Sequence, residues 1–156
     1  MVVVAACSPS GPVSQSPPTI YLVPRSVPDG WSPVSVAMPS PSSTTQTYLP
    51  PNVTGFALPA SGMELTIMAN STFDAAVAAA EQAYGGPFEV ASGKIRGRPA
   101  EILAWGDHGP VAVVVDEGGG IASTLLSGGL TSQQSVAIDE SLAPVTADEF
   151  ARFSGR

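Results

Sequence analysis

The chain of 156 residues carries little charge, and positive charge is especially scarce. Charged residues make up 12% of the sequence, whereas an average globular protein has roughly 25%. Six lysines and arginines stand against thirteen acidic residues, so the net charge is -7. A nucleic-acid-binding module needs a basic surface and a membrane-surface peptide needs a polybasic cluster. The composition therefore argues against both classes.

Cysteine and histidine occur once each, as Cys7 and His108. A single cysteine excludes an intramolecular disulfide and any cysteine-rich zinc site, and a single histidine excludes metal centres built from two or three histidines. No apolar run approaches the length that a membrane-spanning helix needs. From these absences we expect no metal, no cofactor and no transmembrane helix.

Proline is abundant but unevenly placed, since 12 of the 16 prolines come before residue 60. Residues 8–18 consist almost entirely of Ser, Pro and Gly and cannot bury enough apolar surface to offset the entropy of ordering them. We therefore assign residues 1–19 to a truncated signal sequence with a flexible, disordered tether, and residues 20–156 to one folded domain. The second Pro/Ser-rich stretch, Pro39–Asn52, is expected to be a long loop.

The residues before the tether, Val4-Ala5-Ala6-Cys7, resemble a bacterial lipobox. In that motif small residues precede the cleavage site, and the cysteine thiol accepts diacylglycerol. Only six residues precede Cys7, with no basic region and no apolar core, so we expect an upstream start or a trimmed sequence. This predicts an extracytoplasmic domain, anchored by lipid to the outer face of the cell membrane. In the alternative interpretation, Met1 is the true start, the protein is cytosolic and Cys7 is an ordinary thiol.

Periodicity predicts the central elements of the domain. Met63–Ile67 alternates apolar and polar residues, as a half-buried strand does. Ser71 is the expected N-cap of an alanine-rich helix over Thr72–Tyr84, which is followed by two glycines. Glu101–Trp105 and Val111–Val115 are expected to form a hairpin.

Further patterns complete the predicted fold, with short strands at Ile20–Pro24, Pro33–Met38, Phe88–Ala91, Lys94–Arg96 and Ile121–Leu126. Thr131 and Gln134 have the spacing of a capping box, which would open a helix to about Leu142 before Pro144 ends it. A second box at Thr146 and Glu149 predicts a short last helix containing Phe150 and Phe153. The fold class is therefore α+β, with a mostly antiparallel sheet packed by two or three helices.

Three basic residues, Lys94, Arg96 and Arg98, alternate along the chain. A continuous strand would display all three on one face. They would then form a binding surface for an anionic lipid headgroup, a cell-wall polymer or an acidic peptide. In the alternative interpretation they guard an edge strand against aggregation.

His108 and Trp105 are the remaining candidate binding residues. His108 follows Asp107 in a predicted hairpin loop, and a serine hydrolase using His108 would need a serine hydroxyl within hydrogen-bond reach of the ring. The chain lacks the G-x-S-x-G and S-x-x-K motifs of such enzymes, so we predict no catalytic residue. Trp105 is expected either in the core or lining a cleft, and Asp116–Gly120 is expected to be a turn.

Several segments of the chain carry a family resemblance: Gly97–Ala100, Ile102–Trp105, Leu130-Thr131, Val136–Leu142, Tyr21–Pro24 and Val27–Trp31. Together they resemble the C-terminal domain of Gram-positive, actinobacterial-type envelope lipoproteins. That domain is similar to MucB/RseB-type periplasmic anti-sigma regulators and to lipoprotein-sorting carriers. The resemblance implies a curved antiparallel sheet packed by helices, whose concave side can hold an acyl chain or an apolar peptide.

These observations lead to one principal expectation. The chain is predicted to be a lipid-anchored, non-enzymatic binding or regulatory module of the cell envelope, whose partner is an envelope protein or an anionic polymer or lipid. The alternatives are a carrier of a small apolar ligand or lipid, which needs a sizeable apolar cavity, and the serine hydrolase using His108.

Overall fold

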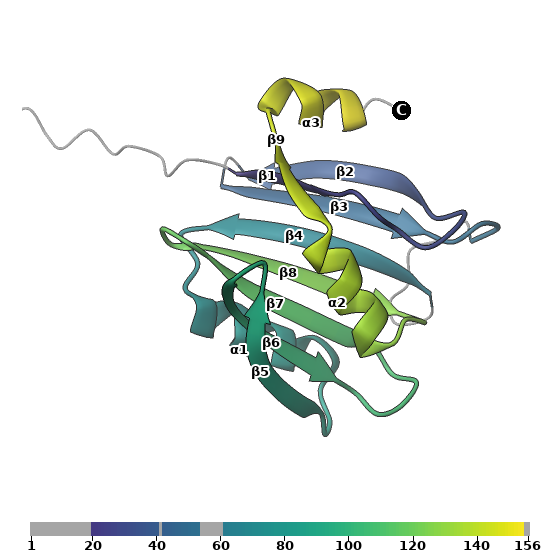
Figure 1. Cartoon of the computed structure of the whole chain (residues 1–156), viewed down its shortest axis with the longest axis vertical. Helices are drawn as coiled ribbons and strands as arrows, with labels where there is room; N and C mark the ends of the chain where they lie inside the picture. Colours follow the sequence, from purple (N-terminus) through teal and green to yellow (C-terminus); the bar gives the residue numbers. More distant parts are fainter. Residues whose placement is uncertain (1–19, 41, 54–60, 155–156) are drawn as a thin grey trace, which may run out of the picture.

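A computed structural model of the chain describes residues 20–40, 42–53 and 61–154. The fold is α+β, as the sequence predicts: a seven-stranded antiparallel sheet, a two-stranded antiparallel ribbon and three helices (Figure 1). None of the described helices is long and apolar enough to cross a membrane. Cys7 and the predicted tether fall outside the described residues.

The strands of the large sheet lie in the order β2-β3-β4-β8-β7-β6-β5. Their bounds are β2 (Ser32–Ser40), β3 (Ser43–Leu49), β4 (Gly62–Ala69), β5 (Glu89–Ile95), β6 (Arg98–Ala104), β7 (Val111–Gly118) and β8 (Ile121–Gly128). The ribbon pairs β1 (Tyr21–Pro24) with β9 (Leu142–Val145), and the helices are α1 (Phe73–Tyr84), α2 (Ser132–Glu140) and α3 (Ala147–Ser154).

Each face of the sheet has its own hydrophobic core. On one face α2 and the ribbon cover the strands, and Ile138 and Leu142 pack with inward-facing strand residues such as Val113. On the other face Ala76 and Ala80 of α1 pack on alternate residues of β6, β7 and β8. Figure 1 shows the two helices on opposite sides of the sheet. β7 is buried on both faces, and therefore Val111–Val115 is a continuous apolar run.

The helix signals are largely confirmed. The capping box at Thr131 and Gln134 is present in α2, and the box at Thr146 and Glu149 opens α3. The N-cap of α1 is Thr72, not Ser71, since the Thr72 hydroxyl accepts the Ala75 amide at 3.2 Å.

The expected end of α2 is wrong. The helix stops at Glu140, and Leu142–Val145 is strand β9, with Pro144 inside it opposite Leu22. This strand exists because it pairs with β1 from the other end of the chain, and that long-range pairing overrides the local helical pattern.

The expected loop at Pro39–Asn52 is also wrong, because β2 continues to Ser40 and β3 follows at Ser43–Leu49. Threonine-rich segments favour strands, and a strand at a sheet edge tolerates prolines such as Pro33 and Pro39 in β2. The polar appearance of β3 is misleading. Gln46 is buried, and it donates to the Leu22 carbonyl at 2.6 Å while it accepts the Tyr48 hydroxyl at 3.0 Å.

Candidate functional site

The hairpin formed by β5 and β6 carries the predicted basic residues. The chain reverses at Arg96-Gly97, where both residues have positive φ (52° and 75°), as a type I′ turn requires. Lys94 lies opposite Pro99, and Ile95 lies opposite Arg98. Because directly opposed residues share a face, Lys94 and Arg98 lie on opposite faces of the sheet. The prediction of one strand with three cations on one face is therefore wrong.

Arg96 turns its side chain back onto the sheet and joins a buried ion-pair network. Its Nη1 and Nη2 donate to the two carboxylate oxygens of Glu117 at 3.1 and 2.6 Å. Its Nε and Nη2 donate to Oδ1 of Asp139 at 3.2 and 2.9 Å. Arg96 thereby connects the hairpin to β7 and to α2.

The two carboxylates of this network are not equally satisfied. Glu117 uses both oxygens and also accepts the Ser123 hydroxyl at 2.6 Å. Asp139 is fully buried, and its Oδ2 accepts no hydrogen bond from any described residue. Burial raises the pKa of Asp139 to about 6, against the opposing effect of the Arg96 guanidinium.

Arg98 is also engaged by this network. Its side chain is half exposed, with Nε 3.4 Å from Oε2 of Glu117 and Nη1 donating to the Glu117 backbone carbonyl. Lys94 is exposed and forms no ion pair with a described residue. Two of the three predicted cations are thus occupied within the protein.

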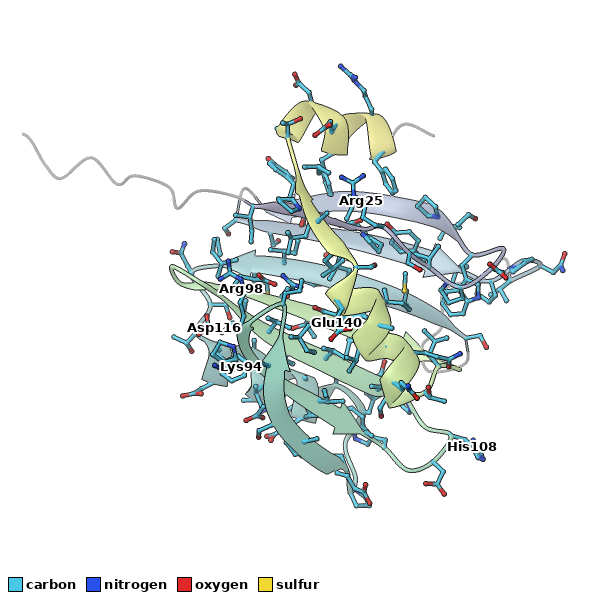
Figure 2. All side chains as sticks on the ribbon, viewed as in Figure 1. Arg25, Lys94, Arg98, His108, Asp116 and Glu140 are labelled. Carbon is cyan, nitrogen blue, oxygen red and sulfur yellow. The ribbon has the colours of Figure 1, made fainter. Side chains whose placement is uncertain are left out.

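His108 and Trp105 lie apart from this network. His108 is exposed in the loop between β6 and β7, at the other end of β6 from Arg98 (Figure 2). In the described part of the chain, no serine hydroxyl is hydrogen-bonded to its ring. Trp105 packs between Tyr84 and Phe88, with ring centroids 5.2 and 5.4 Å away. Its indole N–H donates to the Gly85 carbonyl at 3.0 Å, so Trp105 holds the end of α1 against the sheet.

Two clefts meet at the start of β5. The larger, about 370 Å³, lies between the β6–β7 loop and the start of α2, and is lined by Glu89, Ala104, Gly106, Asp107, Gly109, Val111, Leu130, Thr131, Ser132 and Gln133. The second, about 220 Å³, is lined by Pro87, Phe88, Glu89, Ala104 and Gly106. Glu89 borders both clefts. Elsewhere, an apolar groove of about 140 Å³ lies between α1 and the sheet.

The two edges of the large sheet differ in their protection. The β2 edge contains Pro33 and Pro39 and breaks its register with β3 twice. The β5 edge contains no proline and pairs with β6 in unbroken register. Six of the seven β5 residues are exposed, including Val90 with 48% of its surface accessible. Edges are normally blunted by proline, bulges or charge, and β5 has only the charges of Glu89 and Lys94, so it is the less protected of the two.

The hairpin register identifies the outward backbone groups of β5. In a two-residue hairpin the flanking pair, here Ile95 and Arg98, exchanges both hydrogen bonds, and such pairs alternate along the strands. The N–H and C=O groups of Val90, Ser92 and Lys94 therefore point away from β6. The sequence suggested an edge strand only through its basic residues, whereas the relevant signal is the proline-free, small-residue segment from Val90 to Gly93.

Comparisons with models of known protein families, with curated proteins and with solved structures found no match to this chain. Among the described residues, no group of three or more His, Cys, Asp or Glu side chains is arranged to hold a metal ion.

Proposed function

We propose that this chain is a non-enzymatic binding module of the cell envelope, anchored through Cys7, which holds an extended segment of a partner protein along β5. The observation that carries the proposal is the exposed edge of the sheet at β5. The opposite edge, at β2, is protected by prolines and register shifts. An extended peptide that adds a strand to such an edge gains backbone hydrogen bonds, and neighbouring pockets select its side chains.

The structure favours this surface over the basic one inferred from sequence. Glu117 and Asp139 engage Arg96, and Glu117 also engages Arg98, so an anionic partner would have to compete with buried carboxylates. The apolar groove of about 140 Å³ is also smaller than the roughly 300–1,000 Å³ typical of small-molecule sites. The cleft of about 370 Å³ reaches that size, but its lining includes charged and polar residues such as Glu89, Asp107 and Gln133, which do not suit an apolar ligand. Binding along a strand edge requires neither unpaired basic side chains nor a large apolar cavity.

Replacing Ser92 by proline tests the strand-addition proposal. Ser92→Pro removes the central outward N–H and leaves the bonds to β6 in place, because an edge strand tolerates proline on its solvent side. Ser92→Ala is the matched control, since it retains the N–H. Peptides selected from a random displayed library on the immobilised full chain should bind wild type and Ser92→Ala but lose binding to Ser92→Pro.

Two measurements make the outcome decisive. Circular dichroism should show that Ser92→Pro is folded, and Val90→Pro, which removes another outward N–H, should repeat the loss. A selection that yields only peptides indifferent to both prolines would overturn the proposal of binding along β5.

Mass spectrometry tests the anchor separately. The gene is expressed with its upstream region in its native host, and the N-terminal peptide is analysed from the membrane fraction. We expect an N-terminal peptide that begins at Cys7 and carries diacylglycerol, and Cys7→Ala should abolish the modification. An unmodified peptide that begins at Met1 would contradict the envelope location.

A further inference from the structure

We propose that β5 selects an antiparallel partner strand that carries an acidic residue opposite Lys94 and, five residues later, a basic residue opposite Glu89. This inference rests on the proposed function and adds the register and chemistry of the partner.

The charges along the β5 edge carry the inference. Glu89 and Lys94 stand near the two ends of the strand, and the four residues between them are uncharged. Both side chains are exposed, and neither forms an ion pair with a described residue. The other basic residues of the hairpin, Arg96 and Arg98, face carboxylates within the protein. The edge thus presents one available anion and one available cation at a defined separation.

The two charges lie on different faces of the sheet. Ile95 belongs to the core beneath α2, so Glu89, an even number of residues away, lies on that face, whereas Lys94 lies on the α1 face. A partner residue opposite Glu89 therefore adjoins the cleft of about 370 Å³. A long basic side chain there can reach past the Glu89 carboxylate toward Asp107, which lines the same cleft.

We expect an antiparallel direction because the existing sheet is antiparallel throughout. All six strand pairs of the large sheet are antiparallel, and antiparallel pairing is slightly more stable per residue. In that direction the partner residue opposite Lys94 comes first, and the residue opposite Glu89 comes five later. A parallel strand would need the opposite order of charges.

Two peptides of identical composition test the inference, Asp-Thr-Val-Thr-Val-Lys and Lys-Thr-Val-Thr-Val-Asp, each with blocked ends. Both are titrated into the ¹⁵N-labelled full chain and followed by amide chemical shifts. We expect the first peptide to bind on the order of tenfold more tightly, because both of its charges face opposite charges while those of the second face like charges. The shifts should centre on the outward amides of Val90, Ser92 and Lys94.

Charge reversal provides the second arm of the test. The double variant Glu89→Lys with Lys94→Glu keeps the net charge and should invert the preference between the peptides. The control variant Asp148→Lys with Arg152→Glu reverses two exposed charges on α3, which packs against β1 and β2 at the opposite edge of the sheet, and should leave the preference unchanged.

The outcomes distinguish a failure of this inference alone from a failure of the proposed function. Equal binding of both peptides at β5 would overturn the charge register and leave strand addition standing. Preference for the second peptide would overturn the antiparallel direction. If neither peptide shifts the β5 amides, both proposals fail. Concentration-dependent loss of the β5 signals without peptide would make a second copy of the chain the occupant, which also contradicts this inference.

Discussion

Asp139 gives the sharpest prediction about the stability of the fold. Its carboxylate is fully buried, only one of its oxygens accepts hydrogen bonds from Arg96, and the other has no partner among the described residues. Burial raises the pKa of Asp139 from 3.8 to about 6. We predict that Asp139→Asn removes a pH dependence of stability that wild type shows in this range.

The sign and size follow from proton linkage. Between pH 3.8 and 6 the folded protein retains the proton on Asp139, whereas the unfolded chain has released it. The free energy of unfolding therefore falls as the pH rises through this window. A pKa difference of one corresponds to about 1.4 kcal/mol, so the loss contributed by Asp139 is up to about 3 kcal/mol. The stabilisation contributed by protonated Asp139 is therefore complete below pH 3.8 and lost above about pH 6.

Urea denaturation at pH 4, 5, 6 and 7 measures this effect. Asparagine has the same shape without the titration, and Arg96 keeps its paired contact with Glu117. The stability of Asp139→Asn relative to wild type should increase by up to about 3 kcal/mol from pH 4 to pH 7. An exposed carboxylate in the β6–β7 loop provides the control, since Asp107 does not act on Asp139 and Asp107→Asn should follow the wild-type profile. Parallel profiles of wild type and Asp139→Asn would refute the reasoning.

Two further predictions concern local geometry, and thermal or urea unfolding checks both. Thr131→Ala removes the hydroxyl that caps α2 and should lower stability by about 1 kcal/mol, whereas Thr131→Ser should retain most of it; equal losses would contradict a capping role. Gly109→Ala places a Cβ 1.6 Å from the Trp105 carbonyl oxygen, so the loop must shift, at about 1–3 kcal/mol. Gly93→Ala meets no atom within 4 Å and is the control; a similar loss there would contradict the steric explanation.

The elements that the sequence predicts correctly depend on short-range signals. The alternation in β4, the hairpin of β6 and β7 and the two capping boxes each involve residues within a few positions of one another, or joined by a short loop. The predictions for β3 and β9 are wrong because both strands depend on residues far away in the sequence. β3 is polar in composition but buried between β2 and β4, and β9 forms only because β1 lies beside it.

The candidate site was only partly visible in the sequence. The sequence indicates Lys94 and allows an edge strand, but it predicts Arg96 within a strand, whereas the structure has a turn at Arg96-Gly97. Asp139 carried a weak signal, because the helical period places it on the same face as Ser135 and the apolar Ile138. The structure shows that all three are buried. Glu117 carried no signal, since an acidic residue beside three glycines is equally typical of an exposed turn.

Sequence by itself determined the α+β class, the two helix caps and the hairpin that places Trp105, because these follow from local hydrogen bonding and from the periodicity of burial. The tertiary structure alone decided the order of the strands, and with it which edge is exposed. It also decided that Arg96 faces two carboxylates from distant parts of the chain rather than solvent. Strand order and ion pairing join residues far apart in the sequence, and no local pattern specifies the partner across such a separation.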